Sequence, residues 1–290
     1  MGHTDRGSTM SDRTTILLDG LRFGEGPRWH KGRLWFSDMH DCKVLALDLN
    51  GQVETIVTVP NQPSGLGWLP DDTLLIVSMA DRRLLKNTPA GLEEVADLSS
   101  LASFHCNDMV VDATGRAYIG NFGFDLLNNA PRDFAELVLV TPNGEARVVA
   151  KEMRFPNGTV ITPDGNTLIV GETTAAALTA FDITADGSLD NRRTWAQLDN
   201  AVPDGICLDA DDGIWVASPV SNEVLRVTEG GQVTDRIQVE TQAFACMLGG
   251  EDRKTLFILT AESSSPADSE NKRSGRVEAV RVAVAGAGSP

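Results

Sequence analysis

The sequence contains no apolar run long enough to cross a membrane and no surplus of basic side chains. All of its apolar stretches are shorter than the roughly 18 residues that a membrane-spanning helix needs. Lysine and arginine together number 25, against 41 aspartates and glutamates, which gives a formal net charge of −16. Nucleic acids and anionic membranes are bound through basic patches, so this balance argues against both as partners. It is compatible with a solvated acidic surface and also with a site that attracts cations.

The amino terminus and the cysteines also lack familiar signatures. Residues 1–13 are polar and contain no apolar core of a secretory signal, so we expect a disordered leader before the folded chain. No two of the four cysteines show C-x-x-C spacing; they are Cys42, Cys106, Cys207 and Cys246. In a chain without a secretory signal we expect reduced, buried thiols rather than disulfides or a zinc site, and a cytoplasmic location.

One six-residue pattern recurs along the chain. Its copies begin 40 to 51 residues apart, and each is a short apolar run rich in β-branched and aromatic residues, which is typical of a buried strand. The six copies are residues 33–38, 73–78, 116–121, 167–172, 213–218 and 255–260. Most follow a turn signal such as Lys31-Gly32 or Asp164-Gly165, which fits a hairpin connection from an earlier strand.

Each copy is followed by another strand, and the first five repeats continue through a turn such as Asn50-Gly51 into a fourth. The sixth repeat ends before its fourth strand, which residues 14–18 at the amino terminus can supply. Four strands per repeat and radial closure describe a β-propeller, whereas a β-sandwich would not explain six matching repeats. We therefore expect an all-β, six-bladed β-propeller with four antiparallel strands per blade, formed by residues 14–290 as one domain.

Polar side chains recur at one place in the repeats, eight to ten residues before the six-residue pattern. The positions are Glu25, Ser64, Asn107, Asn157 and Asp204, and the sixth repeat reads Phe244-Ala245-Cys246. In equivalent blades these side chains point toward one axis, where converging carboxylates would repel one another without a compensating cation. Hard oxygen ligands favour calcium, with magnesium, manganese or zinc as alternatives. Loop capping explains any single position as well, so the prediction rests on the shared phase.

Two long connections, residues 122–135 and 261–275, emerge on the face from which the chain enters these inner strands. Long loops gathered on one face are consistent with a rim over a site, although neutral insertion explains their length equally well. Two other kinds of site are disfavoured. No Gly-x-Ser-x-Gly elbow of a serine hydrolase occurs. The acidic segment that starts at Asp209 has Val220, not glutamate, at the twelfth place of a calcium-binding EF-hand loop.

The ordered motifs resemble the SMP-30/gluconolactonase/luciferin-regenerating-enzyme family of six-bladed propellers. The resemblance covers nearly the whole chain after residue 15 and rests mainly on Gly24-Glu25-Gly26-Pro27, His105-Cys106-Asn107-Asp108, Pro156-Asn157-Gly158 and Pro203-Asp204-Gly205. Members of this family commonly hydrolyse lactones, often sugar lactones, with a divalent metal. The resemblance implies that Glu25, Asn157 and Asp204 are the metal ligands and that Asn107 lies close to the metal or the substrate.

The chain departs from the family pattern at one place. Members that act on aldonolactones often have an arginine two places before the asparagine of blade three, where this chain has His105. An acidic residue further along that blade falls at Asp125. The departure weakens an aldonolactone assignment and leaves the metal site untouched. We expect Asn107, His105 and Asp125 to contact the substrate.

These observations predict a metal-dependent lactonase, a carboxylic ester hydrolase whose partner is a small-molecule lactone. Asp204 is the first candidate for the base that deprotonates the attacking water, and His105 is the second. A phosphotriesterase of the diisopropyl-fluorophosphatase kind is an alternative, because a cation at a channel mouth also polarises a P=O bond. A non-catalytic, metal-stabilised ligand-binding propeller is another. The sequence determines neither the native metal nor the oligomeric state.

Overall fold

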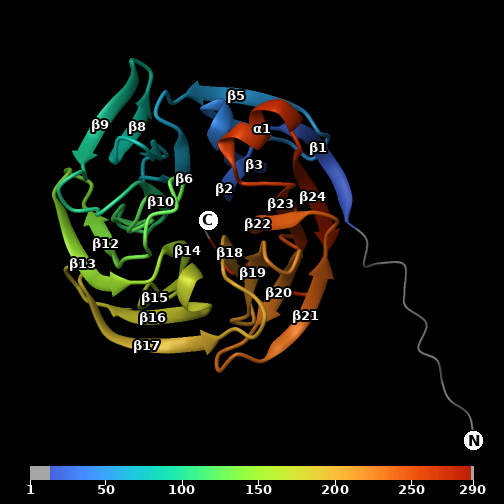
Figure 1. Ribbon diagram of the computed structural model, residues 1–290. Helices are drawn as coiled ribbons and strands as arrows, with labels where there is room; N and C mark the ends of the chain where they lie inside the picture. The colour runs from blue at the N-terminus through green and yellow to red at the C-terminus, as the bar shows by residue number, and fades with distance from the viewer. Residues whose placement is uncertain (1–13, 289–290) are drawn as a thin grey trace, which may run out of the picture.

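The computed structural model describes residues 14–288, so the predicted leader over residues 1–13 lies outside the described residues. The chain forms six four-stranded antiparallel sheets arranged as blades around a central axis (Figure 1). This is the predicted six-bladed β-propeller.

The first three blades follow one another directly along the chain. Blade 1 contains β2 (Gly24–His30), β3 (Arg33–Asp38), β4 (Lys43–Leu47) and β5 (Val53–Thr58). Blade 2 contains β6 (Pro63–Trp68), β7 (Leu74–Ser78), β8 (Arg83–Thr88) and β9 (Gly91–Asp97). Blade 3 contains β10 (Cys106–Val111), β11 (Ala117–Asn121), β12 (Ala135–Val140) and β13 (Ala146–Met153).

The last three blades complete the circle. Blade 4 contains β14 (Pro156–Ile161), β15 (Thr167–Glu172), β16 (Ala177–Ile183) and β17 (Leu189–Gln197). Blade 5 contains β18 (Ile206–Leu208), β19 (Ile214–Ser218), β20 (Glu223–Val227) and β21 (Val233–Gln238). Blade 6 contains β22 (Gln242–Gly249), β23 (Thr255–Ala261), β24 (Gly275–Arg281) and the first strand of the chain, β1 (Thr15–Leu21).

The ring closes as the sequence predicts. Strand β1 pairs antiparallel with β24, with Thr15 opposite Ala279 and Leu21 opposite Gly275. Because β1 supplies the outer strand of a blade whose other strands come from the far end of the chain, the first and last segments hold each other in place. This closure leaves no blade incomplete and so limits exposed strand edges.

Apolar side chains pack between neighbouring blades rather than only within them. The largest cluster joins blades 5, 6 and 1, and it includes Trp215, Phe257, Leu34 and Phe36, all at most 1% exposed. These residues come from the six-residue patterns that identified the repeat. The same β-branched and aromatic side chains that favour strands therefore also stabilise the contacts between blades.

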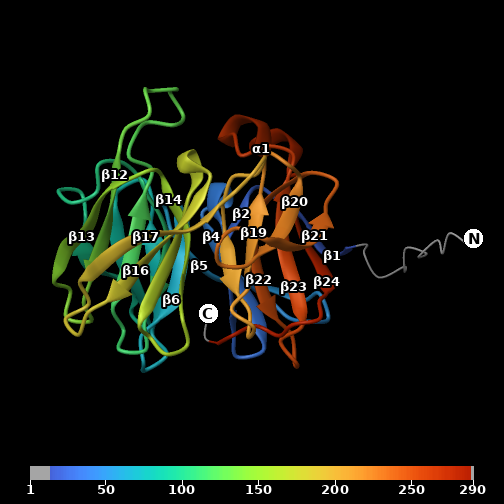
Figure 2. The ribbon, with the colours of Figure 1, turned by 90° about the horizontal axis from the view of Figure 1, so that it is seen from below.

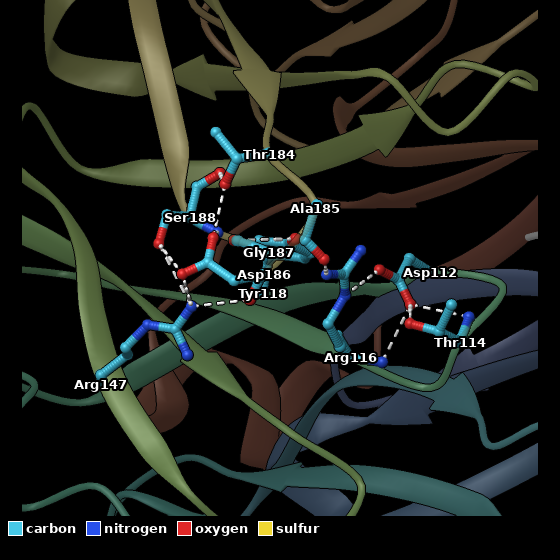
Figure 3. Close-up of polar contacts among 10 residues, drawn as sticks. All are labelled: Asp112, Thr114, Arg116, Tyr118, Arg147, Thr184, Ala185, Asp186, Gly187 and Ser188. Atoms are coloured by element: carbon cyan, nitrogen blue, oxygen red, sulfur yellow. Dashed lines mark hydrogen bonds and ion pairs between the residues drawn. The ribbon is translucent and has the colours of Figure 1, made fainter.

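Hydrogen bonds add to this packing between blades 3 and 4 (Figure 3). The turn between β16 and β17 accepts three bonds through its backbone oxygens. Tyr118 Oη donates to Gly187 O at 3.0 Å, Arg116 Nη1 to Ala185 O at 3.0 Å, and Arg147 Nη2 to Asp186 O at 2.7 Å. The turn is thereby fixed to the neighbouring blade.

One face of the disc carries the helical segments and the long connections (Figure 2). The short 3-10 helices η1 (Met39–Asp41) and η2 (Thr173–Ala175) follow β3 and β15, and α1 (Pro266–Lys272) lies in the long β23–β24 connection. The β11–β12 connection rises from the same face. We call this the upper face. Within residues 14–288 there is no helix with the length and apolar character required to cross a membrane.

The opposite end of the channel holds a cavity of about 510 Å³. Its walls come from the lower halves of the inner strands and from their hairpin turns, and they include Arg28, Trp68 and Arg253. The carboxyl-terminal tail crosses this end, since Gly286 N donates to Arg253 O at 2.9 Å and Ala287 N to Leu208 O at 3.1 Å. None of the six residues predicted to bind the metal or the substrate lines this cavity.

Candidate metal centre and active site

The five polar residues singled out from the repeat lie at equivalent places in the inner strands. Four are the second residue of their strand, namely Glu25 in β2, Ser64 in β6, Asn107 in β10 and Asn157 in β14. Asp204 lies just before β18, where its backbone N–H donates to Ala217 O at 3.0 Å. Phe244, in β22, occupies the sixth place. We call these six residues the polar ring, although its sixth member is apolar.

The backbone changes register next to the polar ring. In five of the six blades the pairing of the inner strand with its neighbour shifts by one residue, between Glu25 and Arg28, Pro63 and Leu66, Cys106 and Met109, Pro156 and Thr159, and Ala243 and Ala245. Such bulges re-aim side chains and are frequent beside active sites. The bulge therefore explains how one residue in each of these five inner strands can face the axis while the rest of the strand keeps its apolar contacts.

Glycines after the polar ring allow the inner strands to approach one another. A Cβ atom at Gly158 would lie 2.4 Å from Ile206 N and 2.7 Å from Asp204 O. The backbone of blade 4 is therefore in direct contact with that of blade 5, and Gly158 N donates to Asp204 O at 3.1 Å. This bond holds Asn157 beside Asp204.

A polar side chain at the upper end of the second strand fixes the segment before the polar ring in four blades. Asp38 Oδ1 accepts from Phe23 N at 2.8 Å, Asn121 Oδ1 from Phe104 N at 3.4 Å, Glu172 Oε2 from Arg154 N at 2.6 Å, and Ser218 Oγ from Val202 N at 3.2 Å. All four acceptor residues are at most 3% exposed. From the sequence, these residues were predicted only to lie in strands. The available signal was that each is the polar last residue of a mostly apolar six-residue pattern.

Two carboxyl groups of the polar ring lie close enough to affect each other. Burial raises the pKa of Glu25 well above its ordinary value, and the nearby charges of Asp204 and then Asp108 raise it further. Burial also raises the pKa of Asp204 well above its ordinary value, opposed by a hydrogen bond from Asn157. Glu25, Asn157 and Asp204 therefore lie near one another, although the three come from different blades.

These raised pKa values describe a site that is short of positive charge. Two partly buried, mutually repelling carboxylates bind either a proton or a cation. Within residues 14–288 no group of three or more histidine, cysteine, aspartate or glutamate side chains is arranged to hold a metal ion. The predicted ligand set has two carboxylates and one amide, so it falls outside that kind of group. Its oxygen donors fit a hard divalent cation.

Thr173, the first residue of η2, connects Asn157 to the neighbouring blade. Asn157 Nδ2 donates to Thr173 Oγ1 at 3.3 Å, and Thr173 Oγ1 donates to Pro203 O at 2.7 Å. Because its amide NH₂ group faces Thr173, Asn157 has its carbonyl oxygen free for another partner. Thr173 could have been found from the sequence only by comparing the residues that follow each second strand.

Asn107 and Asp108 lie side by side in blade 3 but have different partners. Ser64 Oγ donates to Asn107 Oδ1 at 3.5 Å, while the buried Asn107 Nδ2 has no hydrogen-bond partner. Asp108 Oδ1 instead accepts from Arg28 Nη2 at 2.8 Å, and both residues are at most 6% exposed. The buried donor on Asn107 is available for a ligand, whereas Asp108 is neutralised by Arg28.

His105 lies two residues before Asn107 and is half-buried. Its ring stacks on Phe104 with a centroid distance of 4.2 Å, and its Nδ1 atom is buried without a hydrogen-bond partner. Burial lowers the pKa of His105, and the negative charge of Asp125 opposes that effect. Asp125 itself lies in the β11–β12 connection, where its carboxylate accepts from Asn128 Nδ2 at 2.8 Å. The structure thus brings His105 and Asn107 together and leaves Asp125 near His105 but bonded within its own loop.

Comparison with known proteins decides the family. The SMP-30/Gluconolactonase/LRE-like region matches residues 23–262. The chain belongs to this family. The motifs around the polar ring indicated the same assignment.

Individual relatives are distant but align over most of their length. The chain is 28% identical over 278 residues to the 6-deoxy-6-sulfogluconolactonase of Pseudomonas putida, covering 92% of this chain and 94% of the relative. It is 25% identical over 263 residues to regucalcin of Danio rerio, covering 85% of each. The solved structure of a calcium-binding protein, regucalcin, from Agrobacterium tumefaciens strain C58 matches with a TM-score of 0.80 and 23% identity, covering 96% of both chains. That structural likeness shows the shared fold.

Proposed function

We propose that this protein is a divalent-metal-dependent lactonase, with the cation held by Glu25, Asn157 and Asp204. The observation that carries the proposal is the pair of partly buried carboxyl groups, Glu25 and Asp204, whose pKa values are raised by desolvation and which lie beside the amide of Asn157. A cation relieves the repulsion between them. The relative from Pseudomonas putida is named a lactonase, which supports a lactone as the substrate.

Calcium is the proposed occupant, because all three ligands offer oxygen and none offers sulfur or imidazole nitrogen. When bound, a divalent cation supplies Lewis acidity that polarises the ester carbonyl and stabilises negative charge on its oxygen. The remaining chemistry is left to the side chains of the polar ring and to His105.

The reaction needs one proton to be removed and one to be delivered. As the oxygen of water attacks the carbonyl carbon, a carboxylate oxygen of Asp204 accepts the proton that water loses. The bond from the carbonyl carbon to the ring oxygen then breaks, and that oxygen receives a proton to become the alcohol of a hydroxy acid. Water and lactone are consumed in equal amounts, and the carboxylate of Asp204 is regenerated.

His105 and Asn107 are placed to serve the substrate. The lowered pKa of His105 favours the neutral imidazole near pH 7, in which one ring nitrogen donates a hydrogen bond and the other can accept a proton. Asn107 Nδ2 can donate to an ester oxygen, since no atom of residues 14–288 uses that donor. His105 is the second candidate for the proton-transfer residue. We propose that Asp125 acts on the substrate only through its charge near His105.

A titration of acid release tests the proposal directly. Chelated protein is given a panel of lactones at constant pH, and Ca²⁺, Mg²⁺, Mn²⁺ and Zn²⁺ are then added back separately. We expect no acid release from the chelated protein and recovery with at least one cation. Phosphotriester turnover far above lactone turnover would favour the phosphotriesterase alternative. A metal-dependent rise in melting temperature without hydrolysis of any lactone would favour a non-catalytic propeller.

A further inference from the structure

Two further sets of equivalent residues lie above the polar ring on the upper face. The first set, two residues before each polar-ring position, is Phe23, Gln62, His105, Phe155, Val202 and Gln242. The second set, directly after the six-residue pattern of each blade, is Met39, Met79, Phe122, Thr173, Pro219 and Ala261. In four blades the two sets are bonded to each other; for example, Met39 N donates to Phe23 O at 2.8 Å and Phe122 N to His105 O at 3.0 Å. We call these twelve residues the collar.

The collar is mostly apolar and contains no acidic residue, lysine or arginine. Phe23, Met39, Met79 and Ala261 belong to one apolar cluster that also contains Phe244 of the polar ring and has Phe122 packed against it. Ring contacts continue this surface, with centroid distances of 4.8 Å between Phe23 and Phe244 and also between Phe122 and Phe155. Apolar side chains therefore contact one another from blade 6 through blades 1, 2 and 3 to blade 4.

Three of the four polar side chains in the collar already bond to the protein. Gln62 Nε2 bonds to His40 Nδ1 at 3.2 Å, Gln242 Nε2 donates to Glu262 O at 3.2 Å, and Thr173 Oγ1 donates to Pro203 O at 2.7 Å. The fourth is His105, whose buried Nδ1 atom has no hydrogen-bond partner among the described residues. The same is true of Nδ2 of Asn107 in the polar ring. Both unpaired atoms lie in blade 3.

This pattern can satisfy an ester group but few additional hydroxyl groups. A sugar lactone presents a series of hydroxyls, and each one that enters an apolar site without a partner carries a desolvation cost. An alkyl or aryl group instead gains free energy in proportion to the apolar area that it removes from water. The exposed Leu126, Leu127 and Phe134 add apolar surface in the connection that rises from the same face (Figure 2).

We propose that the lactone hydrolysed here carries an apolar alkyl or aryl substituent, which packs inside the collar while His105 and Asn107 bond to the ester oxygens. This inference rests on the lactonase activity proposed above and names the substrate class of that same site. The residues that determine it are Phe122 of the collar, on the β11–β12 side, and Phe23 of the collar with Phe244 of the polar ring, on the opposite side.

Kinetics on a graded series of substrates test the inference. Metal-loaded protein is assayed on unsubstituted δ-valerolactone, on δ-lactones with alkyl chains of increasing length, and on glucono-δ-lactone. We expect kcat/KM to rise about fourfold for each of the first few methylenes and to exceed the value for glucono-δ-lactone. Binding of the matching 2-alkylcyclohexanones, which cannot be hydrolysed, is measured by calorimetry and should tighten along the same series.

Two collar variants and one matched control complete the experiment. Phe122→Gln should lower kcat/KM about tenfold or more for the longest alkyl lactone and about twofold or less for δ-valerolactone. Val202→Thr keeps the side-chain shape and should likewise make the increase of kcat/KM with alkyl chain length smaller. Leu49→Gln replaces an exposed leucine in the β4–β5 turn on the opposite face. This control should change neither the kcat/KM values nor their dependence on chain length. Melting temperatures show whether each variant is folded.

Two results contradict these proposals in different ways. If kcat/KM does not change with alkyl chain length and is highest on glucono-δ-lactone, the apolar substrate class is wrong, while the proposed lactonase activity still holds. No turnover of any lactone by the metal-loaded protein overturns both.

Discussion

At the scale of single residues, a buried charge is stable only with a partner, and Arg28 and Asp108 provide one for each other. Arg28 Nη2 donates to Asp108 Oδ1 and to the backbone oxygen of Met109, while Nη1 donates to Pro27 O at 2.8 Å. Burial raises the pKa of Asp108, and the charge of Arg28 opposes that shift. The pair thus adds little net charge to the region around Glu25.

Removing one member of this pair should destabilise the protein strongly. We expect Arg28→Met to lower the free energy of unfolding by about 3–5 kcal/mol, because it leaves a buried carboxyl group without its partner. Urea denaturation of the wild type and the variant measures the loss. Combining Arg28→Met with Asp108→Leu should recover part of it. A loss below about 1 kcal/mol in the single variant would show that the ion pair has little effect on stability.

Asp204 should be indispensable for both metal binding and hydrolysis. Asp204→Asn keeps the shape of the side chain but removes its charge and its capacity to accept a proton. We expect kcat/KM to fall about 100-fold or more. The rise in melting temperature that metal produces in the wild type should be lost as well. Asp212→Asn, at an exposed turn on the opposite face, is the matched control. A variant that retains both properties would refute the role assigned to Asp204.

The sequence could predict the polar ring because the repeat places its members in phase. It could not predict which protein groups each of them would contact. The unpaired Nδ2 of Asn107, the link from Thr173 to Asn157 and the neutralisation of Asp108 by Arg28 each depend on contacts between blades. Nothing in the local pattern around Arg28 indicates a contact with a residue 80 positions away.

At the scale of elements, the turn that leads into β11 depends on one carboxylate. Asp112 Oδ1 accepts from Thr114 N at 2.9 Å and from Arg116 N at 3.0 Å, and Oδ2 accepts from Arg116 Nε at 2.6 Å (Figure 3). Burial alone would raise the pKa of Asp112, but the bonds from Thr114 and Arg116 outweigh it and lower the pKa below its ordinary value. Arg116 is thereby oriented toward the turn of blade 4.

This arrangement predicts a pH-dependent loss of stability. A carboxyl group whose pKa is lowered by folding stabilises the protein above its unfolded-state pKa of about 3.9, and the contribution disappears as the pH falls through the folded-state pKa. Asp112→Asn should therefore lower the free energy of unfolding by about 1.5–3 kcal/mol at pH 7, with a smaller difference near pH 3. Denaturant melts at both pH values provide the measurement.

Asp19→Asn, at an exposed position of β1, should show no comparable effect at either pH. An Asp112→Asn deficit that stays equal at pH 7 and pH 3 would contradict the explanation by a lowered pKa.

The strands were predictable and the helical segments were not. The predicted residues 33–38 and 167–172 are the observed β3 and β15, because short apolar runs between turn signals form buried strands with few alternatives. Helix α1 spans only 7 residues inside a long polar connection, and its Ser265 N-cap makes no side-chain bond. Such a segment carries no apolar period that would identify a helix.

At the scale of the whole molecule, the two ends of the chain both fasten the ring. Strand β1 completes blade 6, and the carboxyl-terminal tail ties blade 6 to blade 5 on the lower face. Ala285 O accepts from Ala210 N at 2.8 Å, and Gly286 and Ala287 donate to Arg253 O and Leu208 O. The sequence predicted the first closure, because the sixth repeat lacked a strand. The tail has no repeat partner that would reveal the second.

Deletion of residues 283–290 should weaken the ring without affecting the proposed site. Three backbone hydrogen bonds are lost, so we expect the free energy of unfolding to fall by about 1.5–4 kcal/mol. Calorimetry measures the change, and lactone turnover at 25 °C should stay close to the wild-type value. A loss of turnover in a fully folded truncated protein would show that the lower face contributes to the activity.

The most direct measurement is the position of a metal ion in crystals grown with Mn²⁺, whose anomalous scattering identifies it without ambiguity. We predict one strong peak on the channel axis, within about 2.0–2.6 Å of oxygen atoms from Glu25, Asn157 and Asp204. A peak elsewhere in the channel, or crystals saturated with Mn²⁺ in which these three side chains point away from a shared ion, would contradict the account.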